Sequence, residues 1–434
     1  MRRVAVVGSG ISGLAVAHSL AAEAVVTVFE AASWFGGHAH TVDLRLEGIE
    51  HGVDTGFLVF NERTYPQLTA LFNRLGVTSA PADMSFSVQA PNAGWEWCGN
   101  DLNGVFAQRS NLFSARFLVM LTDLLRFNRL ATALAERNQD AELDESIGKF
   151  LDRHRFKAAF REGYFLPMIG CIWSCPIAQM LQFPIGTLVR FCHNHGLLQL
   201  SNRPQWHTVR GGSKHYVGKM LTALSDARLT TPVRSVRRLP PGAGTAGVIV
   251  ATDDGSERFD EVVLACHSDQ ALSMLADADG LERATLGAIR YHNNRAVLHT
   301  DGSVLPQRPR AWAAWNYERA ADRRDEDAGV CLHYLINRLQ PLPWKAPVIV
   351  SLNPLRPVRA EAVLGQWDYA HPAFDRAAVR AQGLLPTLQG RSHVWFCGAW
   401  TRYGFHEDGL VSGLAVVDGL RQRWAAQDTA GVAA

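Results

Sequence analysis

A glycine-rich turn near the start of the chain constrains the fold more than any other feature. The β-branched run at residues 4–7 leads directly into Gly8-Ser9-Gly10-Ile11-Ser12-Gly13. In a strand–turn–helix, the first glycine permits the tight turn, the second lets a phosphate approach the backbone, and the third lets the helix pack against the strand. Residues 25–29 then predict a second strand, which ends at Glu30. The sequence therefore predicts an α/β fold with a Rossmann-like parallel sheet.

The same turn predicts the ligand of this sheet. Free N–H groups at Gly10, Ile11 and Ser12 would bind a diphosphate at the helix N-terminus. Glu30 follows the first glycine at about the 20-residue distance expected of the acidic residue that binds a ribose. A carboxylate there suits a free 2′-hydroxyl, as in the adenosine of FAD or NAD, and repels a 2′-phosphate. The alternative is a glycine-rich loop in an unrelated sheet.

Composition excludes several classes of protein. The 434 residues are 47% hydrophobic and 19% charged, which predicts a globular chain of two or three domains or one interleaved body. A net charge of +2 argues against a nucleic-acid-binding protein. No apolar run reaches the roughly 18 residues of a transmembrane helix. Arg2 and Arg3 before an apolar stretch look like a signal peptide, but the glycine spacing favours the strand–turn–helix.

The cysteines predict a reduced, cytoplasmic protein without a metal site. Seven cysteines, an odd number, are scattered along the chain, which does not suit a disulfide framework. Cys171 and Cys175 lie close together but lack a second pair of matching ligands. The two His-x-His sequences are typical of ordinary polar or loop residues.

The residues after Glu30 carry a family resemblance. They run through Ala31 to Gly36-Gly37-His38, then Thr41, then Asp54-Thr55-Gly56-Phe57. This pattern resembles the flavin-containing amine oxidoreductase superfamily, which includes monoamine oxidases, phytoene-type desaturases and protoporphyrinogen oxidases. Within it, the chain is most similar to a bacterial branch described as predicted NAD/FAD-binding proteins. The resemblance implies FAD contacts from Ala31, Gly36, Gly37, His38, Thr41, Thr55, Gly56 and Phe57.

His38 departs from the superfamily pattern, because Arg or Lys usually follows the double glycine. The sequence therefore does not fix whether this position offers the cofactor a positive charge at neutral pH. A further implied contact is Val233, whose counterpart pairs with the adenine edge; an ordinary strand residue is the alternative.

The C-terminal region resembles the second flavin motif of the superfamily. A strand leads to Gly398-Ala399, and residues 403–414 enter a closing helix that is expected to end near Trp424. In the superfamily, this helix N-terminus stabilises the negative charge of the reduced flavin. The resemblance implies FAD contacts from Gly398, Asp408, Gly409, Leu410 and Val411. Ala399 stands where many flavoproteins have Asp. No cysteine matches the residue that tethers flavin in some monoamine oxidases, so we expect FAD to be non-covalent.

We expect two interleaved domains. Residues 1–75, 205–270 and 388–434 form the FAD-binding domain. Residues 76–204 and 271–387 form an α+β substrate domain, with a helical insertion over 105–200 and a sheet from 290–385. The last seven residues, 428–434, are expected to be frayed.

The resemblance implies an oxidoreductase in which a substrate hydride passes to flavin N5. Candidate catalytic residues are His406, Glu407, Tyr334, Asn337 and Trp315, and each has a structural role as its alternative. His406 leads, because it directly precedes the flavin-facing helix; its role would be acid–base catalysis or a hydrogen bond to the flavin. Without a second dinucleotide motif, we expect O2 or a quinone to accept the electrons.

The aromatic content favours a hydrophobic substrate. The chain has 12 Trp and 20 Phe, several of them in the substrate domain, which suits a lipid, fatty-acyl or isoprenoid substrate and a desaturase or oxidase reaction. Oxidation of a small or aromatic amine is one alternative. A flavin-dependent double-bond isomerase or a non-catalytic flavoprotein is another.

Residues 107–135 combine an apolar helical face with Arg109, Arg116, Arg126 and Arg129. This pattern is typical of an amphipathic helix at a membrane surface, which would place the protein peripherally at the inner face of the membrane. A buried helix with solvated arginines is the alternative. Oligomeric state and substrate identity are left open.

Overall fold

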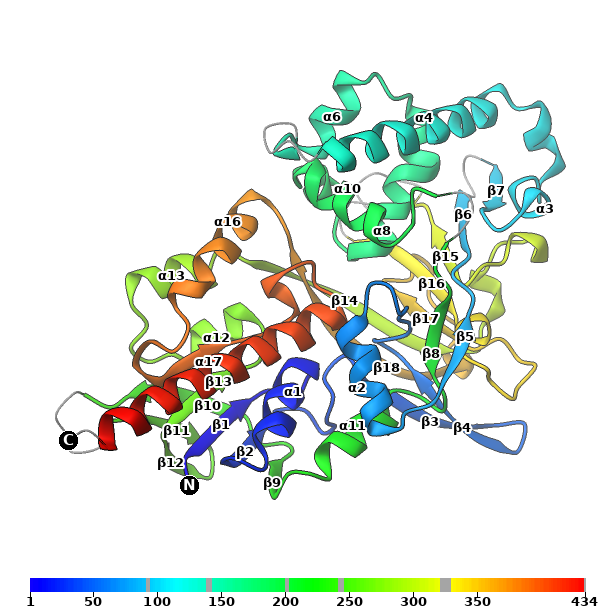
Figure 1. Ribbon diagram of the computed structural model, residues 1–434. Helices are drawn as coiled ribbons and strands as arrows, with labels where there is room; N and C mark the ends of the chain where they lie inside the picture. Colours follow the sequence, from blue (N-terminus) through cyan, green and yellow to red (C-terminus); the bar gives the residue numbers. More distant parts are fainter. Residues whose placement is uncertain (91–93, 138–142, 200–202, 241–245, 321–328, 433–434) are drawn as a thin grey trace.

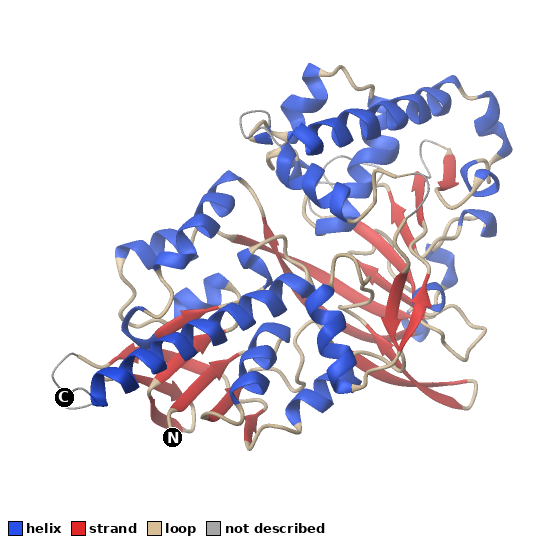
Figure 2. Ribbon diagram, in the orientation of Figure 1, coloured by secondary structure: helices blue, strands red, loops and turns tan. Residues whose placement is uncertain are grey.

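The computed structural model describes residues 1–90, 94–137, 143–199, 203–240, 246–320 and 329–432. One lobe holds a parallel sheet and both termini (Figure 1). A second lobe holds a large twisted sheet, and a group of helices covers its far end (Figure 2). Long strands of the large sheet run between the lobes, so the two lobes share one continuous body.

The parallel sheet has the order β19-β13-β1-β2-β9. These strands are Val394–Phe396, Glu261–Leu264, Arg3–Val7, Val25–Phe29 and Asp226–Arg228. All four pairings between neighbours are parallel. Helices α1 (Ile11–Leu20) and α17 (His406–Val432) pack against one face, where Val4 and Val6 point. The predicted Rossmann-like α/β fold is confirmed.

The other face of this sheet packs against helices from the second half of the chain. Ala5 and Val7 share a hydrophobic core with α12 (Ser268–Met274), α13 (Gly280–Leu286) and α16 (Arg376–Leu384). The sequence-based boundaries assigned these helices to the substrate domain, 271–387. Because they share a core with the parallel sheet, we propose that the FAD-binding domain includes them.

The large sheet has the order β18-β14-β17-β16-β15-β6-β7. Its strands are Val363–Ala373, Arg290–His299, Ile349–Leu352, Cys331–Leu335, Trp315–Glu318, Phe86–Ala90 and Trp95–Cys98. The strands expected from residues 290–385 are present, but β6 and β7 come from residues before the helical insertion. They were not predicted, because β6 pairs in parallel with the distant β15.

The helical insertion lies over one end of the large sheet, as predicted for residues 105–200. Its longest helix is α4 (Ala115–Arg137), and α6 (Ile147–Arg153), α8 (Leu166–Trp173) and α10 (Ile185–Asn194) follow. Helix α8 lies directly on the sheet, because a Cβ at Gly170 would be 3.6 Å from the Tyr317 ring. The predicted apolar face of α4 is divided: Phe117 and Met120 are buried, whereas Leu118 and Leu125 are exposed.

The C-terminal helix is longer than predicted. It continues to Val432 instead of ending near Trp424, so the expected fraying of 428–434 is wrong as far as the described residues extend. In the described part of the chain, no helix is long and apolar enough to cross a membrane.

A buried carboxylate, Asp54, ties three segments together beside the parallel sheet. It ends β4 (Ile49–Asp54), which pairs with β3 (Thr41–Leu46). Its oxygens accept hydrogen bonds from the Thr41 hydroxyl at 2.5 Å, the Ser213 N–H at 2.9 Å and the Gln340 amide at 2.9 Å. Gly212 makes room for this contact, because its φ is +99° and a Cβ there would lie 2.4 Å from the Thr41 methyl group.

We predict that Asp54→Ala destabilises the fold by roughly 2–4 kcal/mol, since it leaves several buried donors without an acceptor. Asp43→Ala on the neighbouring strand is the control, because Asp43 is exposed and its ion pair with Lys214 lies at the surface. This control should cost less than about 1 kcal/mol. Urea unfolding of the two variants measures the difference, and equal midpoints would contradict the role given to Asp54.

Candidate functional site

The carboxyl ends of the parallel strands meet at one edge, where open α/β sheets bind their ligands. Gly8 turns the chain there with a φ of +104°, and a Cβ at this position would lie 2.8 Å from the Ala265 carbonyl oxygen. A Cβ at Gly13 would lie 2.0 Å from the Gly8 carbonyl oxygen. Both glycines are therefore required for the close approach of β1, β13 and α1.

The two sequence motifs lie side by side at this edge, although they stand at opposite ends of the chain. A Cβ at Gly409 would lie 2.9 Å from the Ile11 side chain, and one at Gly413 would lie 2.4 Å from the Ser12 carbonyl oxygen. The first turns of α1 and α17 therefore touch. Two helix N-termini, each with free N–H groups and positive potential, are directed to the same region.

Gly10 differs from the other motif glycines because its surroundings are open. Among the described residues, no atom lies within 4 Å of a Cβ built on Gly10. The double glycine forms the adjoining wall: the Gly36 N–H donates to the Ser9 carbonyl at 3.1 Å, and Gly37 has a φ of +58°. The arrangement is an open cradle over the start of α1, where a diphosphate could approach the backbone N–H groups.

Glu30 holds the glycine turn in place. Its carboxylate accepts hydrogen bonds from the Ser9 N–H at 2.9 Å, the Ser9 hydroxyl at 2.6 Å and the Ala32 N–H at 2.9 Å. An ionised carboxylate has about four acceptor positions, so capacity for a ribose hydroxyl is left. The ribose contact stays a prediction, and the structure adds a role in shaping the turn.

His38 lies in a group of three histidines that the sequence did not reveal. Its ring centroid lies 5.4 Å from that of His371, 6.4 Å from His267 and 4.9 Å from Tyr369. Its Nε2 atom is buried and has no hydrogen-bond partner in the described part of the chain. Burial, and next the neighbouring His267, lower the pKa of His38 to about 4. With this pKa, His38 carries no charge at pH 7 in the protein without a cofactor.

The other two histidines reach this group from separate elements. His267 follows the carboxyl end of β13 and caps α12, and burial lowers its pKa to about 4. His371 lies in β18, and burial and His38 lower its pKa to about 3. His267 was open to prediction from its position after a parallel strand, whereas nothing in the sequence around His371 marks it.

Several predicted cofactor residues are engaged by the protein itself. Thr41 belongs to the Asp54 network, and the Thr55 hydroxyl shares a 2.6 Å hydrogen bond with Tyr369. Asp408 accepts a hydrogen bond from the Phe405 N–H at 3.0 Å, and burial raises its pKa to about 6. Val233 is buried at the start of β10 (Val233–Arg238). Of the remaining predicted residues, Leu410 is buried, Val411 and Gly56 are partly buried, and Ala31 is exposed. Their contacts with a cofactor stay predictions.

His406 lies between two aromatic residues. Its ring stacks on Phe57 with centroids 3.9 Å apart, and its Nε2 shares a 2.6 Å hydrogen bond with the Tyr216 hydroxyl. Burial, with His38 as a second cause, lowers its pKa to about 3. A base this weak is poorly matched to neutral pH, so the geometry favours the hydrogen-bonding role over acid–base catalysis. Sequence analysis missed Tyr216, which lies in α11 (Lys214–Leu221).

Two of the catalytic candidates have structural contacts. Both oxygens of Glu407 accept 2.9 Å hydrogen bonds from backbone N–H groups of Gln67 and Leu68, in the first turn of α2 (Pro66–Leu75). The Asn337 side chain accepts from the Val348 N–H at 2.7 Å and donates to the Ala346 carbonyl at 2.9 Å. Glu407 thus holds the start of α2, and Asn337 holds the segment before β17; a catalytic role for either residue stays a prediction.

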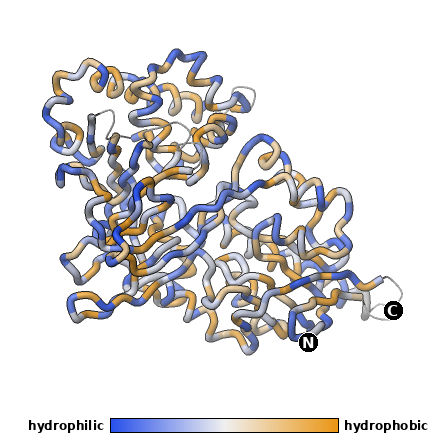
Figure 3. The backbone as a smooth tube through the Cα atoms, turned by 180° about the vertical axis from the view of Figure 1, so that it is seen from behind, coloured by the Kyte–Doolittle hydropathy of each residue, from blue (hydrophilic) through white to orange (hydrophobic). Residues whose placement is uncertain are grey.

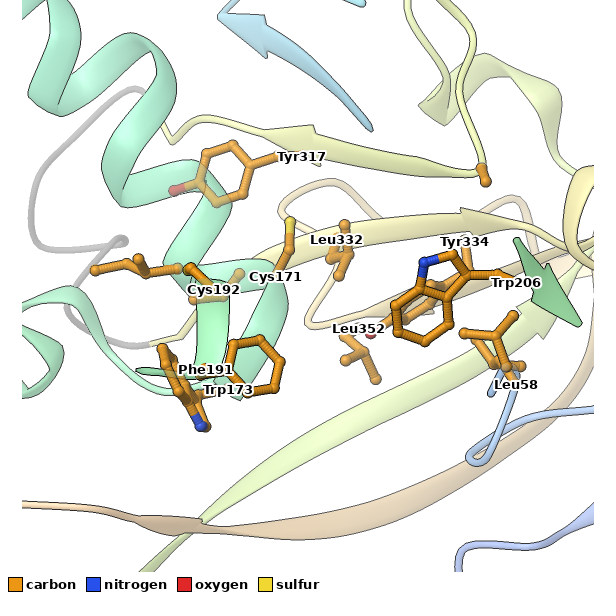
Figure 4. Close-up of a cluster of buried hydrophobic side chains, with 14 of the residues drawn as sticks. Leu58, Cys171, Trp173, Phe191, Cys192, Trp206, Tyr317, Leu332, Tyr334 and Leu352 are labelled. Atoms are coloured by element: carbon orange, nitrogen blue, oxygen red, sulfur yellow. The ribbon is translucent and has the colours of Figure 1, made fainter. Parts of the chain in front are cut away.

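Trp315 and Tyr334 do lie together, on adjacent strands. They face each other across β15 and β16, with ring centroids 4.8 Å apart in an edge-to-face arrangement. The indole N–H of Trp315 is buried and has no partner among the described residues. Tyr334 points into a region of buried hydrophobic side chains between this sheet and helices α8 and α10 (Figure 4). These two residues remain the candidates nearest to a substrate.

The opposite face of the large sheet carries a buried polar network. Glu318, Cys331 and His333 are the one group in the described residues whose ligating atoms are close enough for a metal ion. They also satisfy each other, because His333 Nε2 lies 3.1 Å from Glu318, and Arg356 contacts the same carboxylate at 3.2 Å. Although burial opposes the charge of His333, Cys331 and Glu318 raise its pKa to about 9. An internal ion pair therefore accounts for the cluster, and we propose no metal there.

The three neutral histidines predict a loss of stability in acid. Their pKa values lie at about 4, 4 and 3 in the folded chain against 6.5 for an unperturbed histidine, so below pH 6.5 the unfolded chain binds more protons. The free energy of unfolding should fall as pH drops from about 6.5 to 4, by up to about 1.4 kcal/mol per pH unit for each histidine.

Urea unfolding of flavin-free protein at pH 7.5, 6.5 and 5.5 measures this slope. His38→Phe keeps an aromatic ring without a titrating group and should reduce the slope by up to about 1.4 kcal/mol per pH unit, while His267 and His371 keep theirs. A pH-independent stability, or a slope unchanged in the variant, would contradict the assignment.

Comparisons with known proteins agree with this geometry. The family model for "Flavin containing amine oxidoreductase" matches residues 11–315. A carotenoid phi-ring synthase of Streptomyces griseus is 30% identical over 294 residues, which are 63% of this chain and 54% of that protein. The chain thus spans about half the length of this curated relative.

Solved structures share the fold over nearly the whole chain. A CLA-producing fatty acid isomerase from P. acnes has a TM-score of 0.67 at 14% identity, covering 97% of this chain and 98% of that one. A putrescine oxidase variant scores 0.69 at 15% identity, covering 97% and 99%. Cyclohexylamine oxidase from Brevibacterium oxydans scores 0.66 at 15% identity, also covering 97% and 99%. Since the family model matches well over half of the chain, from the start of α1 to the start of β15, the chain belongs to the flavin-containing amine oxidoreductase family.

Proposed function

We propose that this flavin-dependent oxidoreductase binds FAD non-covalently and oxidises a hydrophobic substrate in a desaturase- or oxidase-like reaction. FAD supplies the two-electron acceptor at N5. The residues of the chain bind and orient it, keep water out of the reaction region and hold the substrate. The observation that carries the proposal is the buried apolar interior between the large sheet and the helical insertion.

The cradle fits FAD in three respects. The open space at Gly10 admits a diphosphate, and Glu30 retains acceptor capacity for the adenosine ribose. The buried, unpartnered Nε2 of His38 is available to a ligand atom in the same region. The first turn of α17 supplies the positive potential that a reduced flavin requires. His38 stands where Arg or Lys is usual, so binding of the diphosphate would depend mainly on backbone N–H groups.

The state of the thiols supports non-covalent binding. Cys397 ends the strand that leads to Gly398, and burial raises the pKa of its thiol to about 12. Burial raises the pKa of the neighbouring Cys266 as well. The reactive form of cysteine is the thiolate, which these surroundings suppress. Acid precipitation should therefore release the yellow colour from the protein.

Gly10 provides a direct test of the cofactor site. Gly10 has a φ of −61°, which alanine adopts freely, and its Cβ would enter the open space where the diphosphate is proposed. We predict that Gly10→Ala unfolds like the parent in the absence of FAD but binds FAD at least about tenfold more weakly, equivalent to about 1.4 kcal/mol.

Gly13→Ala is the matched control for this measurement. Its Cβ would overlap the Gly8 carbonyl, so it should lower the stability of the flavin-free protein itself. Fluorescence titration with FAD and thermal unfolding separate the two effects. Unchanged FAD affinity in Gly10→Ala would place the diphosphate elsewhere.

The substrate proposal follows from the apolar interior. Helices α8 and α10 contribute Cys171, Trp173 and Phe191 to the same group of buried side chains as Leu332 and Tyr334 of the large sheet (Figure 4). All five belong to one hydrophobic cluster and are at most 8% exposed. Such a surface suits a lipid, fatty-acyl or isoprenoid chain better than a hydrophilic amine. The relatives named for a carotenoid synthase and a fatty acid isomerase also support a hydrophobic substrate.

Two alternatives rest on other relatives. The amine oxidases among the solved structures support a small or aromatic amine as an alternative substrate. The fatty acid isomerase supports a second alternative for this chain, which is isomerisation of a double bond without net oxidation. As electron acceptor we propose O2 or a quinone, since the sequence has no second dinucleotide motif. The proposed location is the cytoplasm.

Anaerobic reduction separates these candidates. We predict that fatty-acyl or isoprenoid compounds bleach the enzyme-bound flavin and that air restores the colour, while hydrophilic amines leave it oxidised. Rapid bleaching by a small amine alone would replace the hydrophobic proposal with an amine oxidase. Product formation without bleaching would indicate an isomerase.

A further inference from the structure

The outer side of the helical insertion exposes large hydrophobic side chains. We define the α4 surface as Leu112, Phe113, Leu118, Val119 and Leu125. Phe113 is 90% exposed, and the other four side chains are 41–50% exposed. Elsewhere in the described residues, exposed side chains of this kind are spread more widely along the chain. A concentration of this type marks an interaction site in a folded protein.

Helix periodicity explains why these side chains share one side. Leu118 and Leu125 are spaced as i and i+7, so they lie on one face of α4, and the exposed Val119 widens that face on one side. Phe117, Met120 and Phe127 occupy the opposite face and are at most 1% exposed. The inner residues thus account for the packing of α4, and the outer residues are not needed for it. Phe113 extends the outer face from the short helix Arg109–Phe113 directly before α4.

The exposed charged side chains within residues 109–130 are arginines, one of which, Arg116, lies 3.6 Å from the Glu162 carboxylate on a neighbouring segment. Arg109, Arg116 and Arg129 are exposed, whereas Asp123, the only acidic residue from 109 to 130, is buried. The Asp123 carboxylate accepts a 3.0 Å hydrogen bond from the Lys157 backbone N–H and contacts Arg126. Its charge is thus directed inward, and the outward face presents apolar side chains flanked by arginines.

We propose that the α4 surface docks on an anionic lipid bilayer. The apolar side chains would enter the boundary between headgroups and acyl chains, and the arginines would contact anionic headgroups, as in interfacial amphipathic helices. Charge complementarity favours a bilayer over a protein partner, because an anionic membrane presents negative charge along the whole α4 surface and needs no matching shape. The described helices have no span able to cross a bilayer, so the contact is peripheral.

Docking there would bring the proposed substrate interior close to the source of a lipid. The inner face of α4 packs through Phe127 on Phe165, with ring centroids 5.0 Å apart. Phe165 directly precedes α8, whose Cys171 and Trp173 line the apolar interior. Helix α8 thus connects the inner face of α4 with the region that we propose holds the substrate. This inference rests on the proposed function for the kind of substrate, and its own test is independent of turnover.

The test is cosedimentation of the FAD-loaded protein with vesicles. Binding is expected to vesicles of phosphatidylcholine with phosphatidylglycerol, at least tenfold weaker to phosphatidylcholine alone, and weaker at high salt. The double variant Phe113→Asp with Leu118→Asp should reduce binding to the anionic vesicles at least tenfold. Leu384→Asp is the matched control, because Leu384 is 44% exposed, like Leu118, but lies on α16.

Thermal unfolding and the flavin spectrum show whether each variant is folded. No binding of the parent protein to anionic vesicles at low salt, or equal binding of the double variant, would overturn the proposal. A shift from dimer to monomer in the double variant, without parent binding to vesicles, would overturn it in favour of a contact between copies. Flavin reduction by substrate in detergent tests the proposed function separately, because it needs no vesicle.

Discussion

The contact between the first turns of α1 and α17 is the constraint on which the rest of the molecule depends. Gly409 and Gly413 let α17 approach Ile11 and Ser12, and Gly13 lets α1 approach the turn after β1. Any side chain at these positions would overlap a neighbouring atom and separate the helices. The approach aligns two helix N-termini beside three strand ends. It therefore brings the free backbone N–H groups of both helices together in one region of positive potential.

The absence of a cationic side chain gives the histidine group its significance. His38 replaces a permanent charge with one that depends on its surroundings, and burial, followed by the neighbouring His267, opposes that charge in the protein alone. An anionic diphosphate beside His38 would raise the pKa of this histidine and so act against the lowering caused by burial. Proton uptake and cofactor binding are then linked at this position, whereas an arginine would make binding independent of pH.

The parts of the structure that could be predicted from sequence depend on local rules. The glycine turn, the strand at 25–29 and the helical insertion follow from spacing and periodicity over a few residues. Glu407 and Asn337 show the limit: each looked like a site residue from its neighbours along the chain, yet each contacts backbone groups brought there by packing. The place of β6 beside β15 also depends on pairing between distant segments. No local pattern records which distant group satisfies a given carboxylate or strand edge.

The order of strands in the parallel sheet has a consequence for how the protein folds during its synthesis. The central strand β1 pairs with β13, and β13 pairs with β19, which lies at residues 394–396. During synthesis, β1 can pair at once with β2, but its other edge has no partner until more than half of the chain is made. Because such distant pairings form slowly, this edge is exposed for a long period. The nascent chain would depend on chaperones, and a truncation within α17 would leave one face of the finished sheet covered by α1 but not by α17.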